Sequence, residues 1–181
     1  MSGPRKPEPV KLIASIFSPE GERIDRAVRQ LARRYGDPDY ISAVVPFDET
    51  DYYEPEMGTP LKRRFLSFET LIEPGDLWDI KLHTNDIERE ASVDGRRTVN
   101  IDPGYVARAH LILATGKPYT HRPYVRNGLY ADLTLVYRDK SFQKLEWTYP
   151  DYASRAVREM FNRIRARYLL QLKGTENDEG V

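Results

Sequence analysis

Residues 121–134 read HRPYVRNGLYADLT and contain an Asn-Gly pair between two runs of strand-forming side chains. Asn127 and Gly128 tolerate the positive φ angles that a two-residue type I′ turn requires of both its central residues. The sequence therefore predicts a tight hairpin in which Arg126 lies opposite Leu129. Such a hairpin makes antiparallel pairing the expected arrangement of the second half of the chain.

The predicted register also sets which side chains share a face of this hairpin. Val125 should lie opposite Tyr130, and His121 opposite Thr134. One face then carries the polar side chains of His121, Tyr130, Asp132 and Thr134. The other carries an unbroken apolar row of Leu129, Ala131, Leu133 and Leu135. A bulge at Pro123 is the alternative, and it would turn His121 to the opposite face.

A histidine beside a carboxylate is the feature of the polar face that suggests chemistry. The carboxylate holds the imidazole in one tautomer and makes it a better base near neutral pH. We therefore predict His121 and Asp132 as a catalytic acid/base pair, with Tyr130 and Thr134 as ligand-binding neighbours. Any half-exposed antiparallel sheet shows the same alternation without a site, and this alternative stays open.

Around the hairpin, the second half of the chain is typical of an antiparallel meander. Strands are expected at residues 98–101, 105–114, 119–126, 129–138 and 142–147. Asp102-Pro103-Gly104 between the first two fits a type II turn. Arg108 and His110 alternate with apolar neighbours in the second strand. If the polar faces coincide, one surface carries Arg108, His110, His121, Asp132 and Thr134.

The first half predicts a βαββα unit. A strand at residues 10–17 precedes a helix that Gly36-Asp37-Pro38 ends near Tyr35, and two strands follow at residues 40–47 and 61–70. A second helix opens at Glu73 and runs to about Ala91, and a last helix runs from Asp151 or Ser154 to Lys173. We expect an α+β fold: a βαββα start, an antiparallel β meander and a C-terminal helix. Residues 10–173 would form a single domain between disordered tails at 1–9 and 174–181.

Composition excludes several classes of function. The 28 basic and 28 acidic residues cancel, so no whole-molecule field would attract DNA or an anionic membrane. The chain has no cysteine, which excludes disulfides, thiolate catalysis and thiolate metal ligation. No apolar run approaches the roughly 20 residues of a membrane span. We expect a cytoplasmic protein, and its oligomeric state stays open.

Two acidic segments are candidate metal sites. Asn100 and Asp102 lie two apart at a strand end, where an amide and a carboxylate suit Mg²⁺ or a hydroxyl-bearing ligand. The loop at residues 48–58 is acidic and aromatic and precedes the basic cluster Lys62, Arg63 and Arg64. We take Asp51, Glu56 and Asp102 as candidate ligands of a divalent metal. A plain turn and a solvated loop are the alternatives.

Several motifs together resemble the bacterial family catalogued as domain of unknown function 4416. They are Pro46-Phe47-Asp48, Thr50-Asp51-Tyr52-Tyr53, Glu56-Met57-Gly58, residues 61–68, Ile80-Lys81, Thr84-Asn85, residues 99–105, His121-Arg122, residues 128–135 and residues 147–152. Members often carry the label GTP-binding protein, and a Thr-Lys-Asp run in them resembles a guanine-reading motif. This chain has Gly116-Lys117-Pro118 instead, so the aspartate is missing.

We therefore expect a binder of a small anionic or phosphorylated metabolite, with a nucleotide among the candidates and metal-assisted hydrolysis or transfer as its reaction. Arg64, Lys117 and Arg122 would supply positive charge, and Asn100 would add hydrogen bonds. The alternative is a non-catalytic RNA-binding or protein-interaction module. It would use exposed tyrosines and the arginine face of the last helix, formed by Arg155, Arg158 and Arg165.

Overall fold

The computed structural model describes residues 3–178, with side chains up to residue 174, and its centre is one antiparallel sheet. The strands are β1 (Val10–Ser18), β2 (Pro38–Ile41), β3 (Val45–Pro46), β4 (Lys62–Ile72), β5 (Asn100–Val106), β6 (His110–Thr115), β7 (Tyr124–Arg126), β8 (Leu129–Arg138) and β9 (Ser141–Lys144). They form a nine-stranded sheet of order β2-β4-β1-β5-β6-β8-β7, in which β3 pairs with β4 and β9 with β8. The described segments contain no helix long and apolar enough to cross a membrane.

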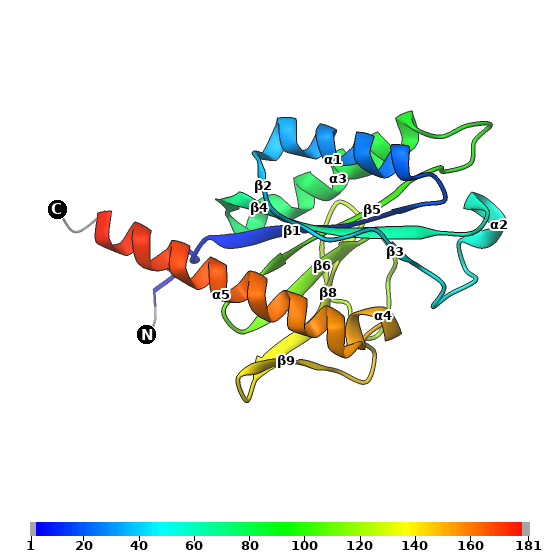
Figure 1. Ribbon diagram of the computed structural model, residues 1–181. Helices are drawn as coiled ribbons and strands as arrows, with labels where there is room; N and C mark the ends of the chain where they lie inside the picture. The colour runs from blue at the N-terminus through cyan, green and yellow to red at the C-terminus, as the bar shows by residue number, and fades with distance from the viewer. Residues whose placement is uncertain (1–2, 179–181) are drawn as a thin grey trace.

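Helices cover both faces of this sheet (Figure 1). Helices α1 (Gly21–Tyr35) and α3 (Leu77–Glu90) lie on one face, and a 3₁₀ turn, η1 (Pro74–Asp76), precedes α3. Helix α5 (Arg155–Asp178) crosses the other face, and the short helices α2 (Glu54–Met57) and α4 (Pro150–Ala153) lie in loops. The predicted α+β fold with its C-terminal helix is confirmed. The βαββα start differs in that its second strand is split into β2 and β3 and the short helix α2 precedes β4.

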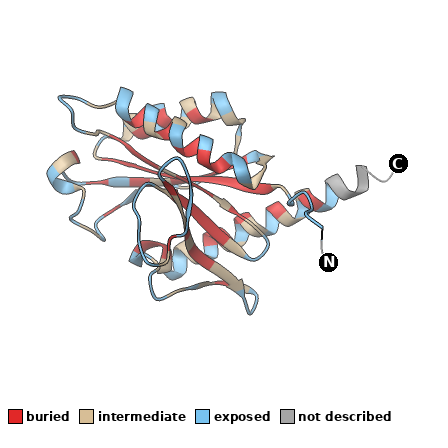
Figure 2. Cartoon of the chain, turned by 180° about the vertical axis from the view of Figure 1, so that it is seen from behind, coloured by how far each residue is buried: buried red, intermediate tan, exposed pale blue. Residues whose placement is uncertain are grey.

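Strand β1 is the centre of the core because all nine of its residues are buried. Leu12, Ala14 and Ile16 pack towards α1 and α3, whereas Ile13 packs towards α5. A strand covered on both faces lacks a clean alternation of polar and apolar residues, as the sequence of β1 does. Figure 2 shows this burial as red along the centre of the sheet.

The Asn-Gly turn forms as predicted, but the hairpin slips just beyond it. Asn127 and Gly128 have φ angles of 53° and 74°. Arg126 lies opposite Leu129 as expected, but it is Tyr124 that pairs with Tyr130 because the register shifts at Val125. The predicted pairings of Val125 with Tyr130 and of His121 with Thr134 are therefore wrong. A bulge, the alternative that Pro123 left open, is what the chain forms near this residue.

A second irregularity breaks the predicted apolar row of β8. Leu111 pairs with Leu135 but the next residue, Ile112, pairs with Leu133, so Thr134 is an extra residue in β8. Leu129, Ala131 and Leu133 consequently pack on the α3 side, whereas Leu135 joins the core under α5. The row is not continuous because one inserted residue reverses the face of everything after it.

The predicted turn at Asp102-Pro103-Gly104 does not exist, because β5 runs straight through it. β6 pairs with β5 only from Gly104 to Val106. Pro103, which has no N–H to donate, therefore lies where β5 lacks this neighbour. Gly104 is required by close packing, since a Cβ there would lie 2.4 Å from the Ile112 carbonyl oxygen. The residues that suggested a turn thus mark the point at which two strands separate.

The two predicted tails also differ from the structure. Residues 3–9 have no regular structure, but Lys6 pairs with Glu73, and Glu8 pairs with Arg108. At the other end α5 continues to Asp178, so the predicted tail from residue 174 begins as helix. Residues 1–2 and 179–181, also predicted as tail, lie outside the described residues.

Gly104→Ala should destabilise the fold by about 1–3 kcal/mol, because the added methyl group meets backbone and Leu113 at overlapping distances. Gly75→Ala is the matched control, since a Cβ at Gly75 has no neighbour within 4 Å, and it should change stability by less than about 0.5 kcal/mol. Urea unfolding measures both variants. Equal stabilities would contradict the packing argument.

Candidate functional site

A cleft of about 900 Å³ opens at the end of the sheet where β5 and β6 separate. α5 begins only at Arg155 and leaves this end of its face uncovered. The lining comes from the loop at residues 47–53, from β4 and β5, from α3, from residues 113–122 with Asp132, and from residues 147–152. Charged and aromatic side chains make up most of it.

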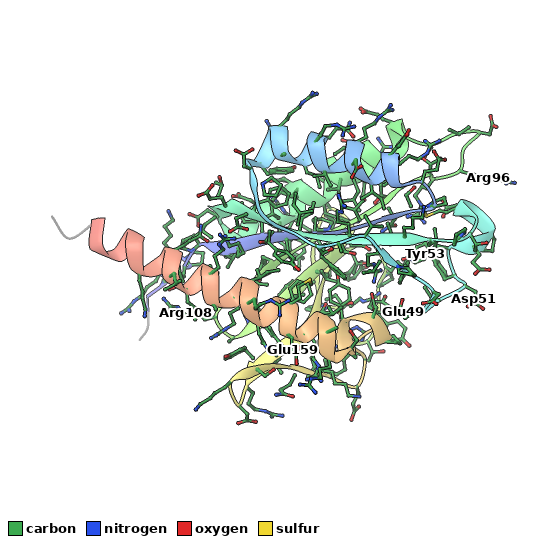
Figure 3. All side chains as sticks on the ribbon, viewed as in Figure 1. Glu49, Asp51, Tyr53, Arg96, Arg108 and Glu159 are labelled. Carbon is green, nitrogen blue, oxygen red and sulfur yellow. The ribbon has the colours of Figure 1, made fainter. Side chains whose placement is uncertain are left out.

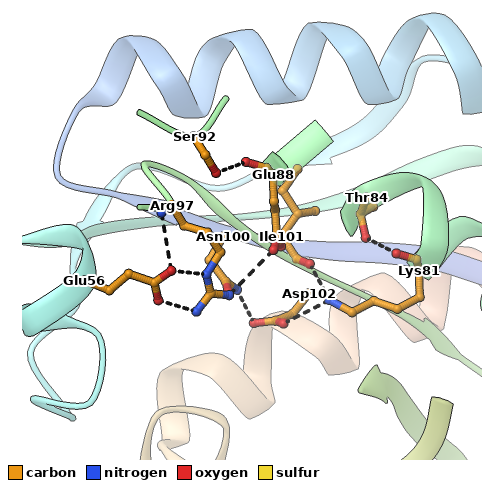
Figure 4. A network of polar contacts seen from close by, with 9 residues as sticks. All are labelled: Glu56, Lys81, Thr84, Glu88, Ser92, Arg97, Asn100, Ile101 and Asp102. Carbon is orange, nitrogen blue, oxygen red and sulfur yellow. Dashed lines mark hydrogen bonds and ion pairs between the residues drawn. The ribbon is translucent and has the colours of Figure 1, made fainter. Parts of the chain in front are cut away.

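Helix α3 replaces the missing strand beside β5. The Lys81 ammonium donates to the Ile101 carbonyl at 3.0 Å, and the Glu88 carboxylate accepts from the Ile101 N–H at 2.6 Å (Figure 4). Lys81 and Glu88 lie two helical turns apart on α3 and face the same strand edge. Their side chains thus satisfy backbone groups that would otherwise be unpaired.

A chain of polar contacts runs along the cleft from this edge (Figure 4). Glu56 holds Arg97 with two hydrogen bonds of 2.6 and 2.8 Å. Arg97 donates to the Asn100 side-chain oxygen at 2.9 Å, and the Asn100 amide donates to Asp102 at 2.8 Å. Lys81 lies 3.7 Å from the other oxygen of Asp102, which is too long for a hydrogen bond. Asp102 therefore keeps acceptor capacity towards the cleft.

Burial raises the pKa of the deepest carboxylate in this network, Glu88. Glu88 is 6% exposed, and burial raises its pKa, although Lys81 and Arg97 act in the opposite direction. Glu56, in contrast, has a pKa lowered by its hydrogen bonds from Arg97. A protonated Glu88 would not cancel the positive charge of Lys81, so the deep end of the cleft becomes more positive as Glu88 is neutralised.

Arg63 and Asp151 close the floor on the side of α4. Their ion pair is buried, and the Arg63 guanidinium lies 3.6 Å from the centre of the Phe47 ring. Next to them the Tyr152 hydroxyl approaches Ser15, but neither oxygen completes a hydrogen bond with the described residues. Burial raises the pKa of Tyr152, so its hydroxyl remains protonated.

The structure brings the predicted pair His121 and Asp132 together, although not through the predicted register. The His121 Nε2 lies 3.6 Å from an Asp132 oxygen, which is an ion-pair distance rather than a hydrogen bond. Arg122 donates to that same oxygen at 2.8 Å, and Thr134 donates to the other at 3.1 Å. Each Asp132 oxygen thus already accepts a hydrogen bond from a residue other than His121, and the catalytic role of the pair stays a prediction.

Other predicted ligand-binding residues divide into two groups. Lys117, Arg122 and Asn100 line the cleft together with His121, Asp132 and Asp102. Arg64 does not, because it pairs with Asp25 on the α1 side of the sheet. Tyr130 packs against Tyr124, and Thr134 is fully buried. Both lie outside the cleft lining.

The predicted metal ligands and the predicted polar surface are not assembled. Among the described residues no group of three histidine or acidic side chains could hold a metal ion, so Asp51, Glu56 and Asp102 do not form one. Asp51 lies on the exposed loop near α2 (Figure 3). His110 packs near Tyr105, and Arg108 binds Glu8, so neither shares a surface with Asp132.

Sequence reasoning missed the polar face of α3. Lys81, Thr84 and Glu88 are buried, and Asn85 lines the cleft beside them. Their spacing of three and four residues marks one side of a helix, which was a readable signal. They lie directly beside the apolar stripe of α3, which includes Leu77 and Ile80.

The arginine face of α5 is occupied by contacts within the chain. Arg155 pairs with Glu159, and Arg158 donates to the backbone of Ala153. Arg165 lies 3.3 Å from the centre of the Tyr137 ring. Arg158 and Arg165 therefore stabilise the packing of α5, which weakens the case for an RNA-binding surface there.

Comparisons with known proteins add one match. The family described as Domain of unknown function (DUF4416) matches residues 8–168. No curated protein and no solved structure matches the chain. The matched range includes every segment that lines the cleft.

Glu88→Gln should make the free energy of unfolding less dependent on pH. The folded-state pKa of Glu88 is raised above its ordinary value of 4.5, so the wild type loses stability as the pH rises from 4.5 through the raised pKa. Glutamine keeps an oxygen for the Ile101 N–H but does not ionise. The stability of the variant relative to wild type should therefore be greater at pH 8 than at pH 5.

Urea unfolding at both pH values measures this difference. Glu90→Gln, on the exposed side of the same helix, is the control and should give the same difference at each pH. A constant difference for Glu88→Gln as well would show that the buried carboxyl is not the titrating group.

Proposed function

The chain belongs to the DUF4416 family, whose description names no activity, and we propose from its cleft that it binds a small anionic metabolite. The observation that carries the proposal is a set of donors in the cleft whose capacity the described residues use only in part. Phosphate and carboxylate groups are the ligands that such donors bind best.

Lys81, Asn85 and Lys117 are these donors. The Lys81 ammonium uses one of its three protons for the Ile101 carbonyl. Asn85 lies one helical turn further along α3, and its side chain makes no hydrogen bond with any described residue. The Lys117 ammonium lies 3.9 Å from the centre of the Tyr52 ring and has no ion pair within the described part of the chain. Arg63, Arg97 and Arg122, in contrast, are already paired with carboxylates.

The volume of the cleft suits a metabolite rather than a single ion. Ligand pockets are commonly about 300–1,000 Å³, and this cleft lies near the upper end of that range. A phosphorylated metabolite, with nucleotides among the candidates, would place its anionic group at the lysines. The unused acceptor of Asp102 would suit its hydroxyl groups.

We further propose that the protein hydrolyses or transfers the bound group, and that His121 carries out the proton transfer. This side chain lines the cleft, and its Nε2 lies 3.6 Å from an Asp132 oxygen, which is an ion-pair distance rather than a hydrogen bond. Binding does not depend on this step, so the two can be tested separately.

Screening by thermal shift tests the binding proposal. The probes are inorganic phosphate, glucose 6-phosphate, AMP and GTP, each with and without Mg²⁺. At about 100 times its dissociation constant a ligand adds about 2.7 kcal/mol to stability, which raises Tm by about 5–10 °C in a protein of this size.

Lys117→Ala and Lys81→Gln should each weaken the binding of the active probe at least about tenfold, as the loss of a charge-assisted hydrogen bond does. Lys144→Ala, on β9 and outside the cleft, is the matched control and should bind as wild type does. The proposal fails if no probe raises Tm, or if the response survives in both cleft variants.

A further inference from the structure

Exposed aromatic side chains gather at the mouth of the cleft. Among the described residues five aromatic side chains are exposed: Tyr52, Tyr119, Tyr124, Trp147 and Tyr149. All of them except Tyr124 line this cleft. Single exposed apolar residues need no explanation, but a cluster beside a cavity marks an interaction site.

Tyr119, His121 and Trp147 form a continuous wall within this cluster. The His121 ring stacks on Trp147 at 4.9 Å and 12°, and Tyr119 meets His121 edge-on at 5.2 Å. The Trp147 indole N–H donates to the Leu133 carbonyl at 2.8 Å, which fixes the plane of the ring. A wall that is held in place before binding loses little entropy when a ligand arrives.

Lysine and arginine side chains already lie close to Tyr119 of the wall and to the aromatic rings around it. Lys117 lies over Tyr52, Arg63 lies over Phe47, and Arg122 lies 5.6 Å from the centre of Tyr119 and 5.7 Å from that of Tyr149. A cationic ligand would meet these charges at close range, so the wall does not suit a cation. A neutral ring can stack on it without such repulsion.

The exposure of the lining side chains decreases from the mouth of the cleft to its floor. Tyr119 and Trp147 are 66% and 39% exposed, whereas Lys81 and Asn100 are 7% and 3% exposed. A ligand that fills the cleft therefore presents one end to aromatic rings and the other to buried polar groups.

We propose that the ligand carries a planar aromatic ring, which packs against the wall of Tyr119, His121 and Trp147 while its anionic group lies with Lys81 and Asn85. This inference rests on the proposed function and adds the ring as the second element of recognition. A nucleotide and a simple aryl phosphate share this chemistry.

Two pairs of probes that differ by the ring test it: AMP against ribose 5-phosphate, and phenyl phosphate against inorganic phosphate. Calorimetric titration should show that the ring-bearing member of at least one pair binds tenfold or more tightly, as expected of one stacked ring. The pair that responds identifies the source of the ring. Quenching of tryptophan fluorescence, absent in Trp147→Phe, should accompany its binding.

Tyr119→Ala and Trp147→Leu should remove the advantage of the ring while leaving the binding of the ring-free probe unchanged. Tyr124→Ala removes an equally exposed aromatic outside the cleft and should keep the advantage. Equal binding within both pairs overturns the inference but leaves anion binding standing. A ring advantage that survives in both wall variants also overturns it, as does absence of binding by all four probes. The proposed function falls with it only if glucose 6-phosphate and GTP also fail to raise Tm.

Discussion

The backbone of Ile101 needs hydrogen-bond partners that no strand supplies, and the architecture of the cleft depends on how this need is met. β6 reaches β5 only from Gly104 onward, so the edge of β5 before that point is free. Leaving a buried peptide group unpaired costs about 1–3 kcal/mol. Lys81 and Glu88 of α3 satisfy the carbonyl and the N–H, which lets the sheet open without that penalty.

Lys81 and Glu88 thereby place charged side chains in the protein core, where charges are rare. Removing an ion from water costs several kcal/mol, and buried ion pairs often contribute little to stability compared with apolar packing. The buried charges of Lys81 and Glu88 are therefore hard to explain by stability alone. Their position beside an open cleft, which Asn85 also lines, fits the proposed binding of a ligand.

The order of the elements and the Asn-Gly turn could be predicted from sequence because each depends on local chemistry. Asn127 and Gly128 favour positive φ at two adjacent positions through their own local chemistry. The sequence offered the bulge near Val125 only as an alternative at Pro123, and it gave no sign of the bulge at Thr134, because a pairing register is set by both strands together. Pro103 and Gly104 are typical turn residues, but here they lie where a strand loses its neighbour and where two backbones come close.

His121 shows why the site was harder to predict than the fold. Sequence alternation paired it with Asp132, and the two do lie 3.6 Å apart, but this distance is too long for a hydrogen bond, and Arg122 and Thr134 donate to that carboxylate instead. A base that is held in one tautomer needs a hydrogen bond to its carboxylate, whereas a ring in an aromatic wall needs only a flat neighbour. Trp147 provides that neighbour, at a separation of 26 residues. The geometry thus supports His121 more strongly as part of the wall than as a base.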